Sequence, residues 1–527
     1  MQRHLVKWEA SSFPWSSSAL KLLQSISSSQ SFRPCQQAAI NIAQSGYSLF
    51  LQLPTGAGKS VCFQLPALLD KNKTTLVVTP LRSLLNDQKQ NLVRVGLSDR
   101  ALFLTPGDVP QSIPDHTALI YATPEMILQN PSAATLVKSL VDSNRLSRIV
   151  LDEAHCVVEW GNTFRPSYLD FARYSKTHLP HIPVTFLTAT AVPELVTSTA
   201  SLFGRSLQPL PDPAHPLPAS APTTLVAVQQ MLDRPNLRLQ VLPKSSSVIA
   251  VMAAMLRSKE PAIVYVLSQK DAESVAKSLA AFGIDAQPYH AGMSDAARKR
   301  AQYLWMSGKS SVICATVAFG MGIDRADVRH VIHHSIPLSL SGYMQQIGRA
   351  GRDGQPSVCT LFYAPGDRRR AEFIGSGGDD FVDVSTFRGI RDVIDLVTST
   401  GCRREILHGH FGYPLDECCR NCNCGDAVLI EEDDSKLQVE APRQARRGWK
   451  SNLDVEILYQ TLQQQAKKQS GPLRRDDIVS RKTIETILAH PPASKVELAA
   501  IRGVGQAKAE ASFDILMAHL RRKSKQR

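Results

Sequence analysis

Short runs of apolar, often β-branched residues alternate with helical patterns in the first half of the chain. A helical pattern places apolar residues three or four positions apart, whereas a short continuous apolar run is typical of a strand buried on both faces. The runs are residues 48–53 (SLFLQL), 76–79 (LVVT), 118–121 (ALIY), 149–151 (IVL) and 184–187 (VTFL). The alternation predicts a parallel sheet covered by helices on both faces.

The same alternation returns further along the chain. The second series of runs is residues 262–267 (AIVYVL), 312–315 (VICA), 330–333 (HVIH) and 357–363 (SVCTLFY). These runs predict a second α/β lobe, which has no phosphate loop of its own. Two lobes with one nucleotide loop imply a site in the cleft between them.

Two stretches lack clear periodicity. Residues 206–230 are rich in proline, alanine and serine, which favours a linker or an inserted loop. Residues 428–452, which begin with an acidic run and continue basic and polar, indicate a second linker. The pattern is helical over residues 453–522, and the basic tail 523–527 is expected to fray.

Composition is that of a globular protein with several domains. A chain of 527 residues exceeds one core and suggests three or four units, and 43% hydrophobic with 20% charged residues argues against disorder. No apolar run approaches the length of a membrane span, so no membrane partner is expected. The net charge of +13 and the pI near 9.3 favour a polyanionic partner.

Residues 1–30 form a serine-rich N-terminal extension without a secretory h-region, and a transit peptide is the less favoured alternative.

Five of the ten cysteines lie between Cys402 and Cys424, and the others are scattered through apolar segments. Scattered cysteines in a large chain indicate a reducing compartment, so the cluster predicts a metal site rather than a disulfide framework.

Residues 54–60 (PTGAGKS) follow a predicted strand and precede an apolar helix, which is the context of a phosphate loop. Gly56 and Gly58, after Thr55, allow backbone amides to point at phosphates. Lys59 reaches the β and γ oxygens, and Ser60 can ligate magnesium.

Asp152 and Glu153 end the buried run at residues 149–151. We expect Asp152 to hold Mg²⁺ through its water shell and Glu153 to orient and polarise the attacking water. The loop that follows carries Trp160, Phe164 and Arg165, a set that predicts stacking with nucleobases.

The second lobe supplies residues 345–354 (QQIGRAGRDG), which begin with Gln345. Arg349 and Arg352 are three positions apart, so on a helix both would face the γ-phosphate across the cleft. An arginine in this role is worth roughly 10³ to 10⁵ in the rate of phosphoryl transfer.

The ordered series of motifs resembles that of RecQ-family DNA helicases over residues 13–424. The matching segments are residues 32–36 (FRPCQ), 77–88 (VVTPLRSLLNDQ), 121–125 (YATPE), 186–191 (FLTATA), 233–237 (DRPNL), 289–293 (YHAGM) and 315–324 (ATVAFGMGID). The resemblance implies that Arg33 packs on adenine, that Gln36 reads its edge, and that Thr188 and Thr190 couple the lobes. It also implies two RecA-like lobes, ATP and Mg²⁺ as cofactors, and movement from 3′ to 5′ on single-stranded DNA.

Three positions depart from the family pattern. Ser29 stands where an aromatic residue often precedes the first motif, so stacking on adenine would rest on Arg33 alone. Asn162 and Thr163 replace the His-Asp pair of the aromatic loop, which puts the polar signalling of that loop to the ATP site in doubt. Asp324 stands where asparagine is common.

The cysteine cluster resembles the zinc subdomain of the same family. The resemblance gives Cys402, Cys419, Cys422 and Cys424 as the Zn²⁺ ligands, with Cys418 as a substitute. The last gap is one residue instead of the usual two, which a tight turn can absorb around tetrahedral zinc.

The C-terminal helical segment resembles an HRDC domain. Its capping box at residues 494–497 precedes a glycine turn, where Arg502, Gly503 and Gly505 would lead a helix whose amides point at a phosphate backbone. A plain helical bundle for protein contacts is the alternative. Only about 25 linker residues separate it from Cys424, so we expect no winged-helix domain there.

The predicted organisation has eight parts. They are an N-terminal extension (1–30), lobe 1 (31–205), the first linker (206–230), lobe 2 (231–370), a zinc subdomain (371–427), the second linker (428–452), the HRDC-like domain (453–522) and the tail (523–527).

The sequence predicts an ATP-dependent DNA helicase of DNA repair or recombination, acting on single-stranded and forked DNA. DNA-repair proteins are the expected partners, in the nucleus, or in the cytoplasm if the chain is bacterial. An RNA helicase is disfavoured by the aromatic loop and the cysteine cluster. A non-catalytic scaffold for DNA junctions or strand annealing is the other alternative, against which Lys59, Glu153 and Arg352 argue.

Overall fold

The computed structural model describes residues 2–27, 29–80, 82–156, 166–214, 222–230, 233–320, 325–376, 384–413, 415 and 421–424. The chain divides into two compact units, residues 1–374 with 389–428, and residues 375–388 with 429–527. Nearly all described residues belong to the first unit. The second linker, the HRDC-like segment with Arg502, Gly503 and Gly505, and the tail lie outside the described residues.

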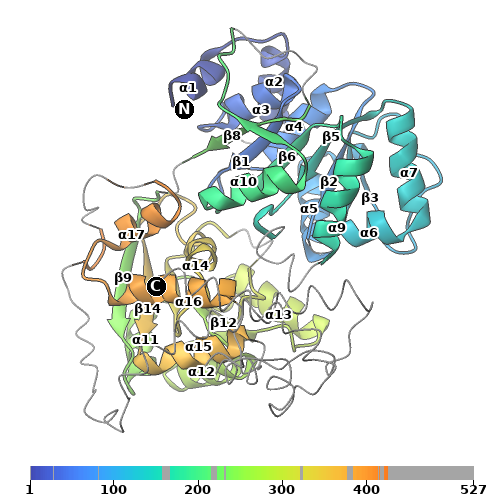
Figure 1. Cartoon of the computed structure of the whole chain (residues 1–527). Helices are drawn as coiled ribbons and strands as arrows, with labels where there is room; N and C mark the ends of the chain where they lie inside the picture. The colour runs from blue at the N-terminus through green and yellow to red at the C-terminus, as the bar shows by residue number, and fades with distance from the viewer. Residues whose placement is uncertain are drawn as a thin grey trace, which may run out of the picture. The chain divides into compact units, whose positions relative to one another are not determined.

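Residues 2–230 form lobe 1, in which helices and strands alternate as the apolar runs predict (Figure 1). The elements of lobe 1 are α1 (Gln2–Ala10), α2 (Ser16–Ile26), α3 (Gln36–Gln44), β1 (Ser48–Gln52), α4 (Val61–Leu69), β2 (Thr74–Val78), α5 (Arg82–Arg94), η1 (Ser98–Arg100), β3 (Ala101–Phe103), β4 (Leu119–Ala122), α6 (Pro124–Gln129), α7 (Pro131–Asp142), β5 (Leu146–Leu151), α9 (Pro166–His178), β6 (Val184–Thr188), α10 (Pro193–Leu202), β7 (Ser206–Gln208) and β8 (Thr224–Gln229).

The sheet of lobe 1 has eight strands in the order β3-β4-β2-β5-β6-β1-β8-β7. Each neighbouring pair is parallel, which confirms the predicted parallel sheet. Strand order places the ends of β5, β6 and β1 side by side, although long segments of chain separate them. The loops after these three strands therefore meet at one edge of the sheet.

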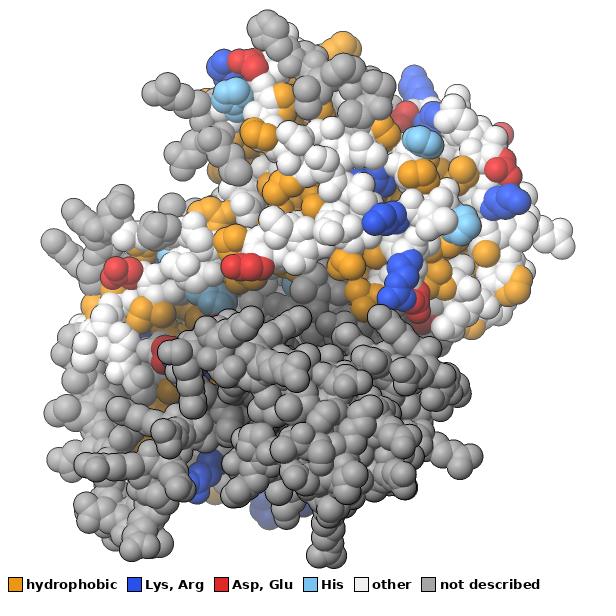
Figure 2. Space-filling view, in the orientation of Figure 1, with side chains coloured by type: hydrophobic (Ala, Val, Ile, Leu, Met, Phe, Trp, Pro, Cys, Tyr) orange, Lys and Arg blue, Asp and Glu red, His pale blue; other side chains and the backbone are white. Residues whose placement is uncertain are grey.

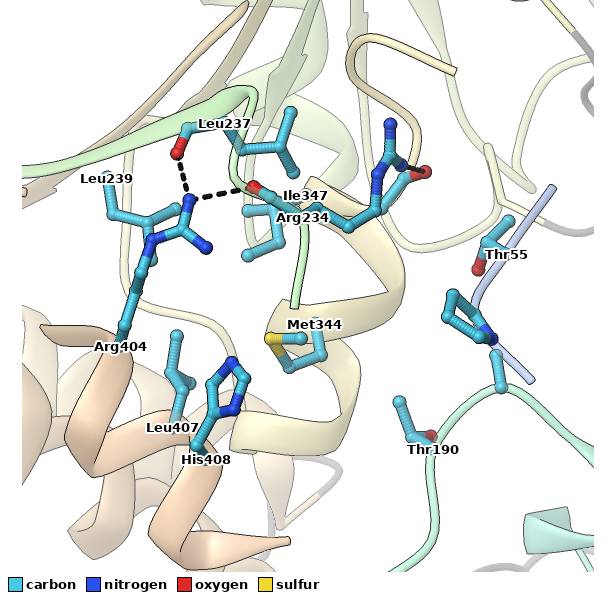
Figure 3. A pocket seen from close by; sticks show the side chains of 13 residues that line it. Thr55, Thr190, Arg234, Leu237, Leu239, Met344, Ile347, Arg404, Leu407 and His408 are labelled. Carbon is cyan, nitrogen blue, oxygen red and sulfur yellow. Dashed lines mark hydrogen bonds between the residues drawn. The ribbon is translucent and has the colours of Figure 1, made fainter. Parts of the chain in front are cut away.

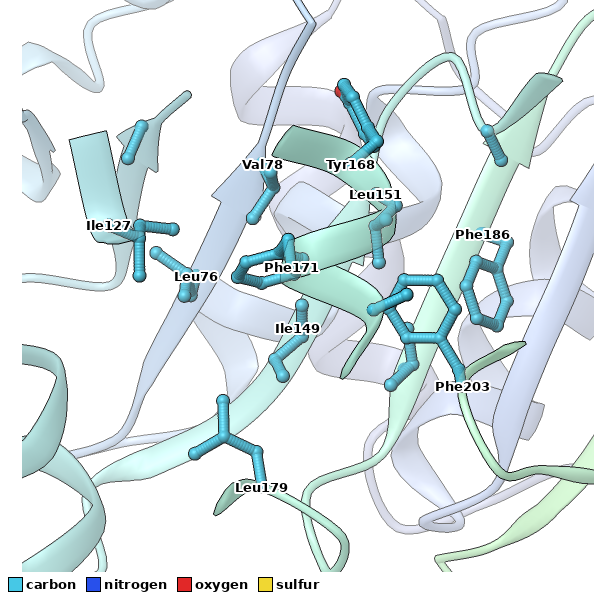
Figure 4. Packing of buried hydrophobic residues seen from close by; sticks show 14 of the residues in the cluster. Leu76, Val78, Ile127, Ile149, Leu151, Tyr168, Phe171, Leu179, Phe186 and Phe203 are labelled. Atoms are coloured by element: carbon cyan, nitrogen blue, oxygen red, sulfur yellow. The ribbon is translucent and has the colours of Figure 1, made fainter. Parts of the chain in front are cut away.

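Successive residues of each strand point to opposite faces of the sheet, as the two-residue period requires. Leu49 and Leu51 pack with α3, α4 and α5, whereas Phe50 packs with the helices of the other face. On that other face Phe171 of α9 lies among Leu76 and Ile149 (Figure 4). Burial on both faces explains why these strands read as continuous apolar runs.

Residues 237–363 form the core of lobe 2, a second parallel sheet with the strand order β11-β12-β10-β13-β14-β9. The elements from this point to the last described helix are β9 (Leu237–Pro243), α11 (Val248–Met255), β10 (Ala262–Tyr265), α12 (Gln269–Ala281), β11 (Ala286–Tyr289), α13 (Asp295–Met306), β12 (Val312–Ala315), β13 (His330–His333), α14 (Leu340–Ile347), β14 (Ser357–Tyr363), α15 (Pro365–Gly375), α16 (Val384–Thr398) and α17 (Arg403–His410). The prediction of a second α/β lobe is confirmed.

The expectation of a linker over residues 206–230 is corrected at both of its ends. β7 and β8 are strands of the lobe 1 sheet, and β8 pairs along its whole length with β1. The proline-rich stretch between them hid the strand pattern of residues 224–229 (TLVAVQ). The buried guanidinium of Arg205 donates to the carbonyls of Pro180 at 2.7 Å and Ile182 at 2.9 Å. These hydrogen bonds link the start of β7 to the loop before β6.

The N-terminal helices are part of lobe 1 rather than a separate extension. Trp8 of α1 is fully buried in the core of that lobe, stacks on Phe13 and meets Tyr47 edge-on. Trp15 donates to Asn41 of α3 at 2.9 Å. The aromatic residues of the first fifteen positions therefore bury the first helix against α3.

Residues 421–423 run beside β9 at the edge of the lobe 2 sheet. The amide of Leu239 donates to the Asn421 carbonyl at 3.2 Å, and Asn423 donates back to the Leu239 carbonyl at 3.1 Å. Backbone pairing thus joins part of the cysteine cluster to this edge. Among the residues that the structure describes, no helix has both the length and the apolar character of a membrane span.

Candidate active site

The phosphate loop joins β1 to α4, as predicted. Gly56 and Gly58 have φ values of +84° and +81°, in the left-handed region that favours glycine. A Cβ atom at Gly58 would also lie 2.5 Å from Nε2 of Gln36, so conformation and space both require glycine there. Thr55 lies next to α14 of lobe 2, since its hydroxyl is 3.4 Å from where a Cβ of Gly348 would be.

Lys59 is half-buried at the end of this loop and donates to the Leu53 carbonyl at 3.2 Å. Burial lowers the pKa of Lys59, and the charges of Glu153 and Asp152 oppose that shift. The charged form of Lys59 would therefore be stabilised by an anionic group that binds beside it. The loop is therefore suited to phosphate.

Arg33 and Gln36 are docked on the backbone of the same loop. Arg33 Nη1 donates to the Gly56 carbonyl at 2.5 Å. The Gln36 amide donates to the Ala57 carbonyl at 2.9 Å and accepts from the Arg33 amide at 2.9 Å. The two residues that the resemblance assigns to adenine thus contact the phosphate loop directly.

Asp152 and Glu153 follow β5, which is separated by β6 from the phosphate loop strand β1. The Asp152 amide donates to the Val78 carbonyl at 3.0 Å, and the Asp152 carboxylate accepts from the Glu153 amide at 3.1 Å. Burial first, and the Glu153 charge second, raise the pKa of Asp152 to about 7. A divalent cation would relieve both effects, so the donor set of Asp152 with the Ser60 hydroxyl fits Mg²⁺.

A line of polar contacts leads from Glu153 into lobe 2 through His155. His155 Nδ1 lies 3.3 Å from Glu153 Oε2 and 3.2 Å from the Thr188 hydroxyl. The Gln345 amide lies 3.1 Å from His155 Nε2 and donates to Thr190 at 3.3 Å. Sequence reasoning did not assign a role to His155, although its place two residues after Glu153 was the available signal.

The two arginines differ from the prediction. α14 ends at Ile347, so Arg349 and Arg352 lie in the turns after the helix and not on one helical face. Carbon atoms of Arg352 lie 3.6 Å from the position of a Cβ at Gly56, against the phosphate loop. Arg349 instead lies within lobe 2. Its Nη2 is 3.3 Å from where a Cβ atom of Gly320 would be. The glycines that flank these residues end the helix early.

Arg234 holds the turn that carries both arginines. Its guanidinium donates to the carbonyls of Gly348 at 3.0 Å and Ala350 at 2.9 Å, and also to that of Gly351. Asn236 donates to Gly351 as well, at 2.9 Å. Sequence reasoning treated this segment only as the start of lobe 2, because contacts with distant carbonyls leave no pattern in the sequence.

A small, partly open pocket lies between these elements (Figure 3). Figure 3 shows Thr55 and Thr190 on one side and residues of α17 on the other, with Met344 of α14 between them. Arg404 of α17 contacts Asp233 and donates to the Arg234 carbonyl at 2.7 Å. The helix beside the cysteine cluster is thereby tied to the segment that holds the arginine turn.

His333 lies under α14 and is almost fully buried. It stacks on Tyr265 with ring centres 5.3 Å apart, and its Nε2 lies 2.7 Å from Oε1 of Gln346. Its Nδ1 is buried with no hydrogen-bond partner. Burial lowers the pKa of His333 to about 4, because a second ring proton would have no acceptor.

Three cysteines of the predicted zinc site come together. The sulfur atoms of Cys402, Cys422 and Cys424 all lie within 4.8 Å of one another, and the first two are 3.8 Å apart. Three converging thiols are a soft donor set that fits Zn²⁺. Cys418 and Cys419 lie outside the described residues.

The aromatic loop residues Trp160, Phe164 and Arg165, with Asn162 and Thr163, also lie outside the described residues, as does Asp324. The segments that flank the loop are described. Cys156 closes the turn after Glu153, with an amide to carbonyl distance of 2.9 Å. Ser167 donates to Glu125 of α6 at 2.5 Å.

Two family models match the two lobes. Residues 33–197 match the DEAD/DEAH box helicase family, and residues 244–354 match the helicase conserved C-terminal domain. The two matches cover the phosphate loop, the carboxylates and the arginine turn.

Several curated proteins are similar to most of the chain. The ATP-dependent DNA helicase Q-like 4B of Arabidopsis thaliana is 35% identical over 81% of the chain, and the RecQ-like DNA helicase blm-1 of Caenorhabditis elegans is 37% identical over 74%. The chain spans only 38% and 39% of these two relatives. It spans 67% of the putative ATP-dependent DNA helicase Q1 of Caenorhabditis briggsae, with 37% identity.

Solved structures share the fold of the two lobes. Dbp5 of S. cerevisiae bound to RNA and ADP BeF3 has a TM-score of 0.50 and 16% identity, and covers 71% of this chain and 97% of its own. The helicase MrfA bound to DNA has a TM-score of 0.50 and 18% identity, over 69% of this chain and 51% of its own. At such low identity these structures show the fold alone.

The buried His333 predicts a dependence of stability on pH. The pKa of His333 is about 4 in the folded chain, below the ordinary value of 6.5, so the unfolded chain binds the extra proton first as the pH falls. The free energy of unfolding is then fully present above about pH 6.5 and decreases towards pH 4, with a loss of about 2 kcal/mol by pH 5. Urea denaturation at a series of pH values measures this slope.

Replacement of His333 by glutamine should flatten part of that slope. Other histidines contribute as well, because burial lowers the pKa of His334 to about 4 and also lowers the pKa values of His330 and His410. The exposed His116 provides the control, and His116→Gln should leave the slope unchanged. An unchanged slope in His333→Gln would show that His333 is not neutral in the folded chain.

Proposed function

The chain belongs to the RecQ family of DNA helicases, and on that basis we propose that it is an ATP-dependent helicase that unwinds DNA. The observation that carries the proposal is the meeting of lobe 1 and lobe 2 groups at the phosphate loop. Lys59, Asp152 and Glu153 come from lobe 1, while Gln345 and Arg352 reach the same place from lobe 2. A loop for phosphate with an arginine against it is the arrangement that phosphoryl transfer requires.

In the proposed reaction the chain binds ATP with the phosphates on the loop at residues 55–60. Lys59 holds the β and γ oxygens, and Ser60 and Asp152 hold the magnesium ion, which neutralises phosphate charge when it is bound. Glu153 orients the attacking water and takes its proton. Arg352 stabilises the charge that develops on the γ-phosphate.

The line from Glu153 through His155 to Gln345 gives the lobes a way to affect hydrolysis. His155 lies 3.3 Å from the Glu153 carboxylate, and Gln345 contacts the imidazole from lobe 2. Movement of lobe 2 would therefore change the position of the base. We infer that closure of the lobes on ATP and their reopening after hydrolysis move the DNA strand.

The DNA contacts and the direction of movement are proposals taken from the family. Trp160, Phe164 and Arg165 would stack on the bases of a single strand and report its presence to Glu153. Movement is proposed to run from 3′ to 5′. On the face shown in Figure 2, basic side chains of the described residues are scattered and do not form one patch, so the net charge of +13 alone does not mark a path for DNA there.

We also propose a role in DNA repair or recombination, on single-stranded and forked DNA, and a nuclear location. Relatives named as DNA helicases in a plant, a worm and a yeast support DNA as the substrate. The HRDC-like segment would add contacts to DNA phosphates through Arg502, Gly503 and Gly505. A non-catalytic scaffold is disfavoured because the lobe 2 groups reach the phosphate loop.

Replacement of Lys59 by alanine tests the phosphate loop. ATP turnover stimulated by single-stranded DNA should fall at least about a hundredfold, because the charge that binds the γ-phosphate is lost. Binding of a labelled strand should remain, since the lysine contacts phosphate of the nucleotide only. Lys71→Ala, an exposed change two residues beyond α4, is the control and should behave as the unchanged chain.

An unwinding assay tests the substrate and the direction. Unwinding should be found with 3′-tailed and forked DNA and not with 5′-tailed DNA or an RNA duplex. Retention of turnover in Lys59→Ala would reject the assigned loop. Unwinding that prefers RNA would reject the proposed substrate.

Replacement of Arg234 by lysine tests the support of the arginine turn. A lysine keeps the charge but has no fork that can span the carbonyls of Gly348 and Ala350. We expect the kcat for ATP to fall about ten- to a hundredfold, because Arg352 would lose its position, with little change in KM. Arg238→Lys, an exposed change on β9, is the matched control. Equal losses in both variants would remove Arg234 from this role.

We propose that the cysteine cluster holds one structural zinc through Cys402, Cys419, Cys422 and Cys424. A structural zinc contributes on the order of 10 to 16 kcal/mol to the folding of small domains. Here it would also hold residues 421–423 beside β9, where Asn423 accepts from the Val241 amide at 3.0 Å.

Elemental analysis should find one zinc per chain, and Cys422→Ser and Cys419→Ser should lose it. Loss of the metal should raise the hydrogen exchange of the Leu239 and Val241 amides, because both donate to the 421–423 segment. Cys418→Ser is the control and should keep the zinc. Metal loss in Cys418→Ser would show that the assigned ligand set is shifted by one residue.

A further inference from the structure

Cys35 has a backbone conformation that side chains rarely adopt. Its φ is +67°, in the left-handed region, directly before the first residue of α3. For a residue with a Cβ atom this conformation costs roughly 1 to 2 kcal/mol. No side chain caps α3 from this position. Something outside the turn must therefore stabilise it.

Glu9 supplies that stabilising contact. Oε1 of Glu9 accepts a hydrogen bond from the Cys35 amide at 2.5 Å. Cys35 is only 6% exposed, so without Glu9 its backbone N–H group would be buried without this hydrogen-bond acceptor. A hydrogen bond to a charged acceptor is stronger than a neutral one.

The helix that carries Glu9 is firmly held. Trp8, the residue before it, donates through its indole to the Pro211 carbonyl at 2.8 Å. The Trp8 carbonyl accepts from Asn41 of α3 at 2.9 Å. α1 is thus fixed to the same helix that Cys35 precedes, and Glu9 bridges a short and rigid gap.

The conformation of Cys35 decides where its neighbours point. Arg33 and Gln36 lie on either side of the turn, and both donate to phosphate loop carbonyls. If Cys35 relaxed to a negative φ, the Gln36 side chain would rotate away from Ala57 and Gly58. The Gln36 amide would then leave its place against Gly58, where it lies 2.5 Å from the position of a Cβ atom.

We propose that Glu9 is a positioning residue for nucleotide recognition, which holds Cys35 left-handed so that Arg33 and Gln36 stay in register with the phosphate loop. The proposal rests on the assignment of this chain as an ATP-dependent helicase. Glu9 does not touch the nucleotide. Burial raises the pKa of the Cys35 thiol to about 11, so the thiol stays neutral and offers the nucleotide no charge.

Replacement of Glu9 by alanine gives the first test. The KM for ATP in the DNA-stimulated reaction should rise about tenfold while kcat changes less than about twofold, because base recognition is impaired and the groups around the γ-phosphate are intact. The ratio of the KM values for GTP and ATP should also fall towards one. A general loss of stability would not change this ratio.

Three further variants separate the proposed role from a structural one. Glu9→Gln keeps a carbonyl oxygen that can accept from Cys35, so it should stay close to the unchanged chain. Cys35→Gly adopts a positive φ without strain, and adding it to Glu9→Ala should restore most of the ATP affinity and the base discrimination. Lys7→Ala is the control on the same helix, since Lys7 forms only an exposed ion pair with Asp212.

The outcomes distinguish this inference from the assignment of function. If the unchanged chain hydrolyses ATP but Glu9→Ala keeps its KM and its preference for ATP, the role of Glu9 is rejected. Failure of Cys35→Gly to rescue Glu9→Ala would also reject it. If Glu9→Ala does not fold, the role of Glu9 is tested by comparing the KM for ATP of Glu9→Gln with that of the double variant that combines Glu9→Ala and Cys35→Gly. If the unchanged chain binds no ATP, the proposed function itself fails.

Discussion

The hydrogen bonds of Gln345 join the two lobes at the place where their functional groups meet. One amide group of α14 reaches both His155 and Thr190 of lobe 1, at 3.1 and 3.3 Å. The other nitrogen of His155 faces Glu153. Such contacts weaken steeply beyond about 3.5 Å, so a shift of lobe 2 by an ångström or two would remove the Gln345 contact and leave His155 held by Thr188 and Glu153 of lobe 1 alone. A helix of one lobe therefore contacts the histidine that lies beside the carboxylate of the other.

Lobe 1 brings several groups to this contact because its sheet is parallel. The strand order β5-β6-β1 aligns three carboxyl ends, so that Asp152 after β5, Thr188 at the end of β6 and the phosphate loop with Lys59 after β1 lie at one edge of the sheet. Lobe 2 contributes from α14 and the turn after it. The first backbone amides of that turn donate to carbonyls three or four residues earlier, while its own carbonyls at Gly348, Ala350 and Gly351 accept from the side chains of Arg234 and Asn236.

The apolar pattern was sufficient to predict both sheets, because strands buried on two faces have no polar positions to interrupt the run. It failed where composition disguised the pattern, as in β8, which follows a proline-rich stretch. The phosphate loop and the two carboxylates could be found from residue type and spacing. The geometry of Arg349 and Arg352 could not, since the end of α14 depends on glycines whose effect varies with tertiary contacts. Glu9 and Arg234 act on distant backbone groups, and no spacing rule connects a side chain with a carbonyl or an amide more than twenty residues away.

The irregular loops of the site share one means of support, which is a polar side chain from elsewhere bonded to their backbone. Arg234 binds the arginine turn, Glu9 binds the turn before α3, and Gln36 binds the phosphate loop. Support of this kind fixes a loop from behind and leaves its outer surface open to a ligand. Gln36 is a special case, because the amide that holds Ala57 is also the group that the family resemblance assigns to the adenine edge. A base that binds this amide must share it with the loop or displace it from the loop. The same holds for Arg33, whose guanidinium donates to the Gly56 carbonyl. Contacts to the base and the shape of the phosphate loop therefore change together.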